Sequence, residues 1–234
     1  MVLVVGATGL LGSHICRLLT EQGKPVRALV RPTSNQATLG LLRGLGAELV
    51  YGDLKDRSSL DAACRGIEAV ISTASSTMSR QDGDSIQTVD GRGQRDLIAA
   101  AVAAGVRRFV LISFPEVPID FPLQSAKREA EESLRRSGMI DTILQPTFFT
   151  EVWLSSALGF DVGNGKARVY GEGSNKISWI SFEDVARFAA APTREPEKAA
   201  KPGNRPALPS SSSMRRSWLY FAVRSPREGA PVLI

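Results

Sequence analysis

Three glycines at even spacing follow a short apolar run at the start of the chain. The run is 2–5, and the segment 6–12 after it reads Gly-Ala-Thr-Gly-Leu-Leu-Gly. A dinucleotide-binding turn needs Gly6 for the tight turn, Gly9 for close approach of the backbone to a pyrophosphate, and Gly12 for packing of the next helix on the strand. The free N–H groups and the dipole of that helix favour phosphate. Because a strand precedes these glycines and a helix follows them, we predict this role in preference to a turn that is merely tight.

The second apolar run, at 26–31, ends in a cation. A site for NAD usually places an acid at this position. That residue is Arg31, and the sequence has no Asp or Glu between Glu21 and Glu48. A guanidinium can pair bidentately with a ribose 2′-phosphate. We therefore expect NADP(H) in preference to NAD(H), with Ser34 and Asn35 as further hydrogen-bonding groups. The alternative is that Arg31 is a solvated charge at a strand end.

These groups need a framework that brings strand ends to one edge of a sheet. Strand-sized apolar runs alternate with helical patterns, and we expect strands at 1–6, 26–31, 47–53, 67–75, 107–114 and 139–146. We expect helices at 11–22, 38–45, 57–64, 94–104 and 125–137. Strands that are apolar on both faces and separated by helices form a covered parallel sheet with right-handed crossovers. The sequence predicts an α/β fold with a Rossmann-type doubly wound parallel sheet.

The net charge of +5 is concentrated at the end of the chain. Residues 192–234 hold eight of the 29 basic and three of the 24 acidic residues, so 1–191 carry 21 of each. The same segment holds seven of the 13 prolines and a run of four serines at 210–213. We predict an irregular Pro/Ser/Arg-rich tail at 192–234, either a linker with a peptide-like extension or the product of a shifted reading frame. Because prolines dilute its charge, we expect neither a nucleic-acid partner nor an adaptor role at membranes.

The composition, with 43% hydrophobic and 23% charged residues, is that of a globular chain with a core for one domain or one and a half. No apolar run approaches the ~18 residues of a membrane span. We also expect no signal peptide, because Met1 leads directly into the first strand. We expect a cytoplasmic protein. Cys16 and Cys64 form no close pair, and His14 is the one histidine, so we predict two reduced thiols, no metal site and no serine-hydrolase triad.

Further motifs follow in the order that this fold requires. They are Gly-Asp-Leu at 52–54, the segment 104–113, the helix with Lys127, Thr-Ile-Leu-Gln-Pro at 142–146, and Ile-Ser-Phe-Glu-Asp-Val-Ala at 180–186. Together with the glycine turn they resemble the atypical short-chain dehydrogenase/reductase group, specifically its NmrA-like and isoflavone-reductase-like NAD(P)-binding proteins. The resemblance covers residues 1 to about 191. It implies a Rossmann domain at 1–146 and a small, apparently incomplete substrate-binding part at 147–191.

The resemblance extends the cofactor site beyond the glycine turn. It implies that Asp53 contacts the adenine, with a helix N-cap as an equal alternative, and that small residues at 72–75 admit the ribose and pyrophosphate. It places the backbone at 146–148 against the nicotinamide, and Asp90 at the start of a helix, where we expect it to act as a cap. The predicted cofactor-binding residues are Gly6, Thr8, Gly9, Leu10, Leu11, Gly12, Arg31, Asp53, Leu54, Thr73, Ala74, Ser75, Lys127, Pro146 and Phe148.

The catalytic pattern departs from that of standard short-chain dehydrogenases, which place a Tyr four residues before the Lys. Here Lys127 is present, but Leu123 stands at the Tyr position and cannot transfer a proton. The resemblance implies that Lys127 binds the nicotinamide ribose and assists proton transfer; the alternative is a surface lysine. Ser113 at the end of the fifth strand is the second catalytic candidate, while Ser125 is too close in sequence to share the helical face.

Aromatic residues after the sixth strand bear on the substrate. Phe148, Phe149 and Trp153 would line an apolar pocket over the cofactor and suit a flat or apolar small molecule; the alternative is plain core. The sequence predicts an NADPH-dependent oxidoreductase of a small carbonyl, quinone or enone-like compound. The alternative is a non-catalytic NADP(H)-sensing regulatory or assembly protein of the NmrA-like type. The oligomeric state stays open.

Overall fold

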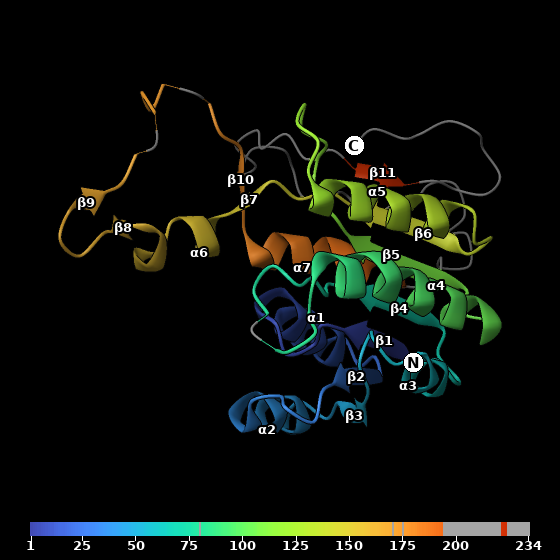
Figure 1. The fold of residues 1–234 in the computed structure, drawn as a ribbon. Coiled ribbons are helices and arrows are strands. Elements are labelled where there is room, and N and C mark those ends of the chain that lie inside the picture. The colour runs from blue at the N-terminus through green and yellow to red at the C-terminus, as the bar shows by residue number, and fades with distance from the viewer. Residues whose placement is uncertain (80, 170, 175, 194–220, 224–234) are drawn as a thin grey trace, which may run out of the picture.

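The structure is a computed structural model that describes residues 1–79, 81–169, 171–174, 176–193 and 221–223. Its centre is a seven-stranded sheet in the order β11-β6-β5-β4-β1-β2-β3 (Figure 1). The strands are β1 (Val2–Val5), β2 (Val26–Val30), β3 (Glu48–Tyr51), β4 (Ala69–Ser72), β5 (Arg108–Ile112), β6 (Ile140–Leu144) and β11 (Phe221–Val223). Strands β1 to β6 are parallel, and β11 pairs antiparallel with β6. The predicted doubly wound α/β fold is confirmed.

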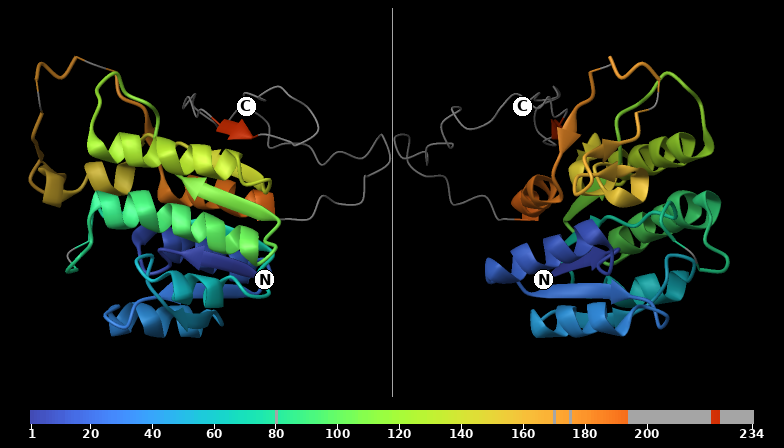
Figure 2. Two further views of the ribbon diagram at one scale, coloured as in Figure 1. Left: turned by 45° about the vertical axis from the view of Figure 1, so that its right-hand side comes forward. Right: turned by 90° about the vertical axis from the view of Figure 1, so that its left-hand side faces the viewer.

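Helices cover both faces of the sheet (Figure 2). They are α1 (Leu10–Glu21), α2 (Gln36–Gly44), α3 (Arg57–Ala63), α4 (Gln94–Ala103), α5 (Pro122–Arg135), α6 (Thr150–Trp153) and α7 (Phe182–Ala190), with a π-helix at Ile86–Gly93. Successive strand residues point to opposite faces. In β1, Val2 and Val4 therefore pack with α1, α2 and α7, whereas Leu3 and Val5 pack with α3, α4 and α5. The continuous apolar runs are those of a sheet buried on both sides.

Local sequence explains where several helices begin. The side chain of Asn35 accepts hydrogen bonds from the first turn of α2, and Ser181 does the same for α7. The cap of α3 is Asp56, which accepts from the Ser58 backbone N–H. The interpretation of Asp53 as an N-cap is therefore wrong. Pro122 stands at the first turn of α5, where its missing N–H costs no helical hydrogen bond.

The helix expected from residue 94 is preceded by two turns that the sequence analysis missed. Residues Ile86–Gly93 form a π-helix, which starts with a reciprocal capping box between Ser85 and Thr88. α4 then begins at Gln94, after the N-cap Gly93. Asp90 lies inside the π-helix, so the expectation that it caps a helix is wrong. π-helical turns are rare and occur often at functional sites.

The segment after β6 combines short elements with one helix of the main body. β7 (Phe148–Phe149) pairs in parallel with β10 (Trp179–Ile180), and β8 (Phe160–Asp161) pairs with β9 (Lys166–Ala167). α7 packs along α1, on the same face of the sheet (Figure 2). Division of the chain at 146 and 191 stays a prediction. The predicted irregular tail lies outside the described residues, apart from residues 192 and 193 and β11.

Two further predictions concern the thiols and the membrane. Cys16 and Cys64 are free and buried. Burial raises the pKa of Cys16 to about 12 and that of Cys64 to about 11, so both thiols are protonated at neutral pH. No helix in the described part of the chain combines the length and the hydropathy that crossing a bilayer requires.

Candidate functional site

The glycine turn lies where the strand order reverses, between β1 and β4. Gly6 has φ +82, and a Cβ there would lie 2.6 Å from Thr73 Oγ1 and 2.9 Å from the Ala74 nitrogen. A Cβ on Gly12 would lie 2.1 Å from the Gly6 carbonyl oxygen. Both positions therefore exclude any other residue in this backbone geometry. The tight turn at Gly6 and the close packing at Gly12 are as the spacing predicted.

The N-terminus of α1 follows the glycine turn directly. Its N-cap is Gly9, whose N–H donates to the Gly6 oxygen at 2.9 Å. Among the described residues, no side chain caps this helix, and its first turn holds no acid. Leu10 is 61% exposed, whereas the side chain of Leu11 is buried in the core, so Leu11 offers its backbone alone. The first N–H groups of a helix have no partner within it, so those of α1 could hold an anion.

The end of β4 lies directly beside the glycine turn. Thr73 donates its N–H to the Val5 oxygen at 2.9 Å and its hydroxyl to the same oxygen at 3.2 Å. Gln94 is fully buried, accepts from Ser72 Oγ at 2.9 Å and donates to the Ala74 oxygen at 3.0 Å. The structure thus brings Thr73 and Ala74 next to the glycine turn, and Gln94 of α4 holds the Ala74 carbonyl in place. Ser75 follows them and contacts Thr77 Oγ1 at 3.3 Å. The sequence analysis placed Gln94 on a helix but did not identify this role of its side chain.

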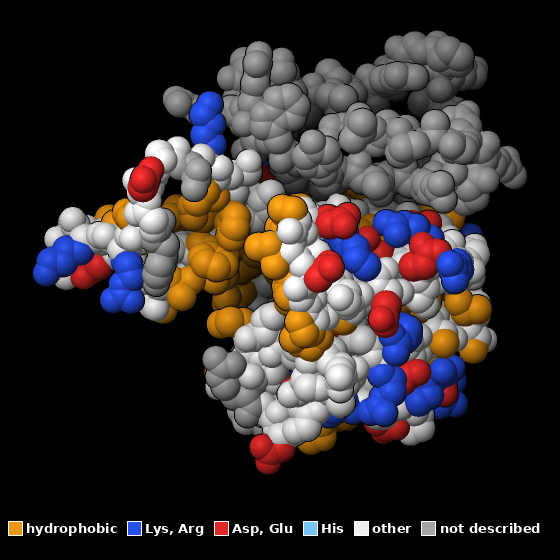
Figure 3. Space-filling model, turned by 45° about the horizontal axis from the view of Figure 1, so that its top comes forward, with side chains coloured by type: hydrophobic (Ala, Val, Ile, Leu, Met, Phe, Trp, Pro, Cys, Tyr) orange, Lys and Arg blue, Asp and Glu red, His pale blue; other side chains and the backbone are white. Residues whose placement is uncertain are grey.

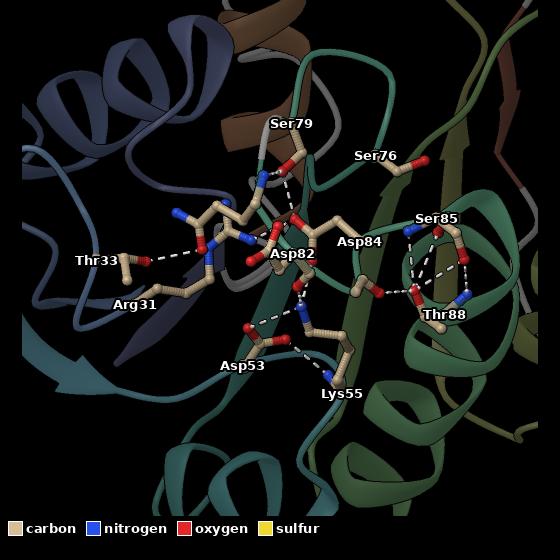
Figure 4. Close-up of polar contacts among 12 residues, drawn as sticks. Arg31, Thr33, Asp53, Lys55, Ser76, Ser79, Asp82, Asp84, Ser85 and Thr88 are labelled. Carbon is tan, nitrogen blue, oxygen red and sulfur yellow. Dashed lines mark hydrogen bonds and ion pairs between the residues drawn. The ribbon is translucent and has the colours of Figure 1, made fainter.

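Arg31 has a partner that the sequence did not reveal. Its Nη1 lies 2.6 Å from Oδ2 of Asp84, whose side chain is 3% exposed (Figure 4). Lys55 and Ser79 also bond this carboxylate. Desolvation opposes ionisation of Asp84, but the hydrogen bonds from Lys55, Ser79 and Arg31 outweigh it and lower its pKa to about 2. The interpretation of Arg31 as a solvated charge is wrong.

Asp53 stabilises the loop after β3. Its Oδ1 accepts from the Lys55 N–H at 2.9 Å, and its Oδ2 lies 3.7 Å from Lys55 Nζ. The side chain of Leu54 is buried, so its backbone is the part that can face a ligand. Asp53 and Arg31 follow neighbouring strands, since β2 pairs with β3. The contact of Asp53 with an adenine stays a prediction.

Lys127 is one of the most buried charged residues in the part of the chain that the structure describes. It is 4% exposed, and its Nζ lies 3.1 Å from Oδ1 of the fully buried Asp90. The second oxygen of Asp90 accepts from the Ser76 N–H at 2.9 Å and from its hydroxyl at 2.7 Å. The surface-lysine alternative is therefore wrong. The structure holds Lys127 in a built polar site, whereas Leu123 is half-buried on the preceding turn of α5.

Ser113 is engaged by an arginine that the sequence analysis did not select. Its Oγ accepts from Arg128 Nη2 at 3.1 Å, and Ser113 is 7% exposed. Arg128 also donates to the Phe114 oxygen and pairs with the buried Glu131 at 3.0 Å. Glu131 in turn accepts from Gln145 at 3.1 Å. This network connects α5 to the ends of β5 and β6.

The aromatic residues after β6 separate into two groups. Phe148 contacts Trp153 edge to face at 5.1 Å between ring centroids and Trp179 at 5.9 Å. Phe149 instead packs on Phe182 at 4.5 Å, in the core. Phe148 is 43% and Trp153 47% exposed. Figure 3 shows hydrophobic side chains gathered between the segment that carries α6, β8 and β9 and the body of the molecule. Pro146 precedes this group and is buried.

Sequence comparison finds proteins of the same kind over most of the chain. The NAD(P)H azoreductase of Xenophilus azovorans is 32% identical over 198 residues, which are 84% of this chain and 64% of the relative. The photosystem II assembly factor Ycf39 of Trieres chinensis is 32% identical over 197 residues, 83% of this chain and 60% of the relative. This chain thus spans somewhat less than two thirds of the length of these relatives.

Structure comparison agrees. The NADPH-dependent quinone oxidoreductase QOR2 of Escherichia coli, solved in complex with NADPH, has a TM-score of 0.64 and 28% sequence identity, and the match covers 81% of this chain and 63% of that one. The family model described as NAD(P)H-binding matches residues 6–196. These findings confirm the resemblance drawn from the motifs and the class of cofactor. The chain belongs to the NAD(P)H-binding family.

Proposed function

We propose that the chain binds NADP(H) at the carboxyl ends of β1 and β4 and reduces a small, flat or apolar compound of the carbonyl, quinone or enone-like class. The observation that carries this proposal is the N-terminus of α1 after the glycine turn, which no side chain in the described part of the chain caps. N–H groups without partners and a helix dipole without a cap favour a pyrophosphate. Residues 6–12 would hold this group through their backbone, Thr8, Leu10 and Leu11 included.

The remaining parts of the cofactor would be held by groups at the same edge of the sheet. Arg31 supports a preference for the 2′-phosphate over a plain ribose, because its guanidinium lies at the end of β2. Asp53 and Leu54, which follow β3, would lie on the side of the adenine. Thr73 and Ala74 lie against the glycine turn, and Ser75 is the next residue in the chain. When bound, NADPH supplies a hydride. Lys127, Pro146 and Phe148 are proposed for the nicotinamide end.

Proton transfer would depend on Lys127 and Ser113. Asp90 holds the Nζ of Lys127 in a site with little solvent. Ser113 accepts a hydrogen bond from Arg128, which uses a lone pair of Oγ and not its hydrogen, so the hydroxyl keeps the capacity to donate. Leu123 has none. The reaction would therefore use a lysine or a serine, or a proton from water, in place of a tyrosine.

The exposed pair of Phe148 and Trp153, with Trp179 beside them, supports a flat or apolar substrate. The names of two relatives, an azoreductase and a quinone oxidoreductase, point the same way. We place the protein among NmrA-like short-chain dehydrogenases/reductases, expect it in the cytoplasm, and leave its oligomeric state open.

A second function has its own support. Leu123 removes the usual proton donor, and Lys127 is paired with Asp90 rather than presented to solvent. One relative is a photosystem II assembly factor. These observations favour a non-catalytic NADP(H)-binding regulatory or assembly protein as the alternative, one that binds the cofactor without turnover.

Titration of the full chain with NADPH, followed by turnover assays with a quinone, an azo dye and an enone, tests both functions. We expect binding by the wild type and near-total loss in Gly9→Val, because a side chain there would fill the place of the pyrophosphate. The matched control is Gly40→Val on α2, where a Cβ meets nothing within 4 Å. A wild type that does not bind NADPH contradicts both functions. Binding without turnover of any compound supports the second.

A further inference from the structure

Two cations from neighbouring strands converge on one carboxylate. Arg31 follows β2, Lys55 follows β3, and both bond Asp84, which the chain supplies from the segment between β4 and the π-helix (Figure 4). Oδ2 of Asp84 accepts from Arg31 at 2.6 Å and also from Ser79 Oγ, while Oδ1 pairs with Lys55. The carboxylate is 3% exposed, against 31% for the Arg31 side chain and 24% for that of Lys55. The acid is thus far more buried than either of its two cations.

The place of this cluster in the fold identifies what else the cations could bind. In a doubly wound sheet, the pyrophosphate lies at the turn after the first strand, and the adenosine lies toward the strand next to it. Here that neighbour is β2, and β3 follows it. Arg31 and Lys55 therefore stand at the adenosine end. An anion there that distinguishes two nicotinamide cofactors is the ribose 2′-phosphate.

We propose that the Asp84 carboxylate takes the place of the cofactor 2′-phosphate in the free protein, and that Lys55 is the second cation, with Arg31, that receives this phosphate. The inference rests on the proposed binding of NADP(H). Asp84 then competes with the 2′-phosphate for the two cations. It has no effect on the binding of a cofactor without a 2′-phosphate. Lys55 becomes a specificity-determining residue alongside Arg31.

The chemistry of the groups supports an exchange. Carboxylates and phosphates accept the same charge-assisted hydrogen bonds from guanidinium and ammonium groups. A phosphate monoester carries about −1.5 to −2 charges at neutral pH, so it attracts the two cations more strongly than a single carboxylate does. Binding of the phosphate must nevertheless break the contacts of Asp84, and a carboxylate left beside a phosphate repels it. Both effects weaken binding of the phosphate while Asp84 is present.

A different role for Asp84 gives the opposite expectation. If Asp84 only orients Arg31 and Lys55 for a phosphate bound elsewhere on them, its removal would loosen both cations and weaken phosphate binding. The sign of the effect of Asp84→Asn therefore separates the two roles. Asn keeps the shape of the side chain and removes its charge.

Calorimetric titration of the full chain with adenosine 2′,5′-bisphosphate and with adenosine 5′-monophosphate tests the proposal without any reaction. For Asp84→Asn we expect the Kd of the bisphosphate to fall about 5- to 20-fold and that of the monophosphate to stay within about 2-fold. For Lys55→Met we expect the Kd of the bisphosphate to rise about 10-fold, again without change for the monophosphate. Lys55→Met also tests the proposal if Asp84→Asn does not fold.

The matched control is Asp61→Asn, which removes one carboxylate charge from an exposed arginine pair on α3, where Arg57 Nε lies 2.8 Å from Asp61. It changes the net charge by the same amount and should leave both nucleotides unaffected. The proposal is overturned if Asp84→Asn binds the bisphosphate no better than Asp61→Asn does, or if Lys55→Met weakens both nucleotides equally. Either result would overturn this inference while the wild type still binds NADPH. A wild type that binds neither NADPH nor the nucleotides instead contradicts the proposed function itself.

Discussion

Lys127 and Asp90 form an ion pair that is almost closed to solvent. Nζ lies 3.1 Å from Oδ1, and the two side chains are 5% and 0% exposed. The pair joins α5 to the π-helix, and the other oxygen of Asp90 holds Ser76 in the chain segment that follows β4. One carboxylate thus ties the predicted cofactor-site lysine to the loop beside the glycine turn.

Breaking this pair from one side should cost far more than its net contribution to stability. A buried charge without its partner costs about 3 to 5 kcal/mol, so we expect Lys127→Met and Asp90→Asn each to lower the free energy of unfolding by roughly that amount. The double variant should recover part of the loss. Urea denaturation measures all three. The exposed Arg57–Asp61 pair is the control, because a surface pair contributes about 0 to 1 kcal/mol; equal losses at both pairs would contradict the burial argument.

The sequence predicted those features that depend on neighbours along the chain. The alternation in Val2–Val5 and the glycines of 6–12 are local, because strand faces and turn geometry follow from adjacent residues. The partner of Arg31 is 53 positions away, and the partner of Lys127 depends on a π-helix whose register no simple period reveals. Long-range pairs of this kind are set by packing.

The cap of α3 illustrates the same limit at short range. Asp53 and Asp56 are both acids just before a helix, and residue type alone does not separate them. Asp56 has extended dihedrals and bonds Ser58, whereas Asp53 bonds the backbone of Lys55. The difference is in the loop path, which the contact of Asp53 N–H with Ser59 Oγ at 3.1 Å helps to fix.

Gly12 should tolerate no side chain. A Cβ added at Gly12 would lie 2.1 Å from the Gly6 oxygen, a backbone atom that cannot move without opening the turn. We expect Gly12→Ala to destabilise the fold by about 1 to 3 kcal/mol, the usual cost of overpacking. Gly40→Ala on α2 is the matched control and should stabilise by about 0.5 to 1 kcal/mol, because its Cβ meets open space. Urea denaturation of both variants gives the comparison, and a neutral Gly12→Ala would show that helix and strand can separate.

Arg31 should select between cofactors. We expect Arg31→Ala to weaken NADPH binding by roughly 1.5 to 3 kcal/mol, the range for a hydrogen bond to a charged group, and to change NADH binding little. The loss has two sources. The variant removes a cation, and it leaves the negative charge of Asp84, which repels a phosphate, with fewer positive partners. Parallel titrations with the two cofactors measure the difference. Equal losses for both would limit Arg31 to supporting the fold.

Asp84 should make the stability of the chain depend on acid pH. Its pKa is lowered from 3.8 to about 2, because the hydrogen bonds from Lys55, Ser79 and Arg31 outweigh the desolvation that opposes ionisation. Between these values the unfolded chain binds more protons than the folded one, so the contribution of this carboxylate is present above about pH 4 and is lost as the pH falls toward 2. At about 1.4 kcal/mol for each pH unit, the full contribution is on the order of 2 kcal/mol.

The difference in free energy of unfolding between the wild type and Asp84→Asn, followed from pH 2 to 7, isolates this term, because the other carboxylates are common to both proteins. We expect a constant difference above about pH 5 that shrinks toward acid. Asp61→Asn, whose pair is exposed, should give a difference that stays small throughout. A difference for Asp84→Asn that does not change with pH would mean that the folded chain holds this carboxyl no more firmly ionised than the unfolded chain does, and that Arg31 and Lys55 do not stabilise its charge.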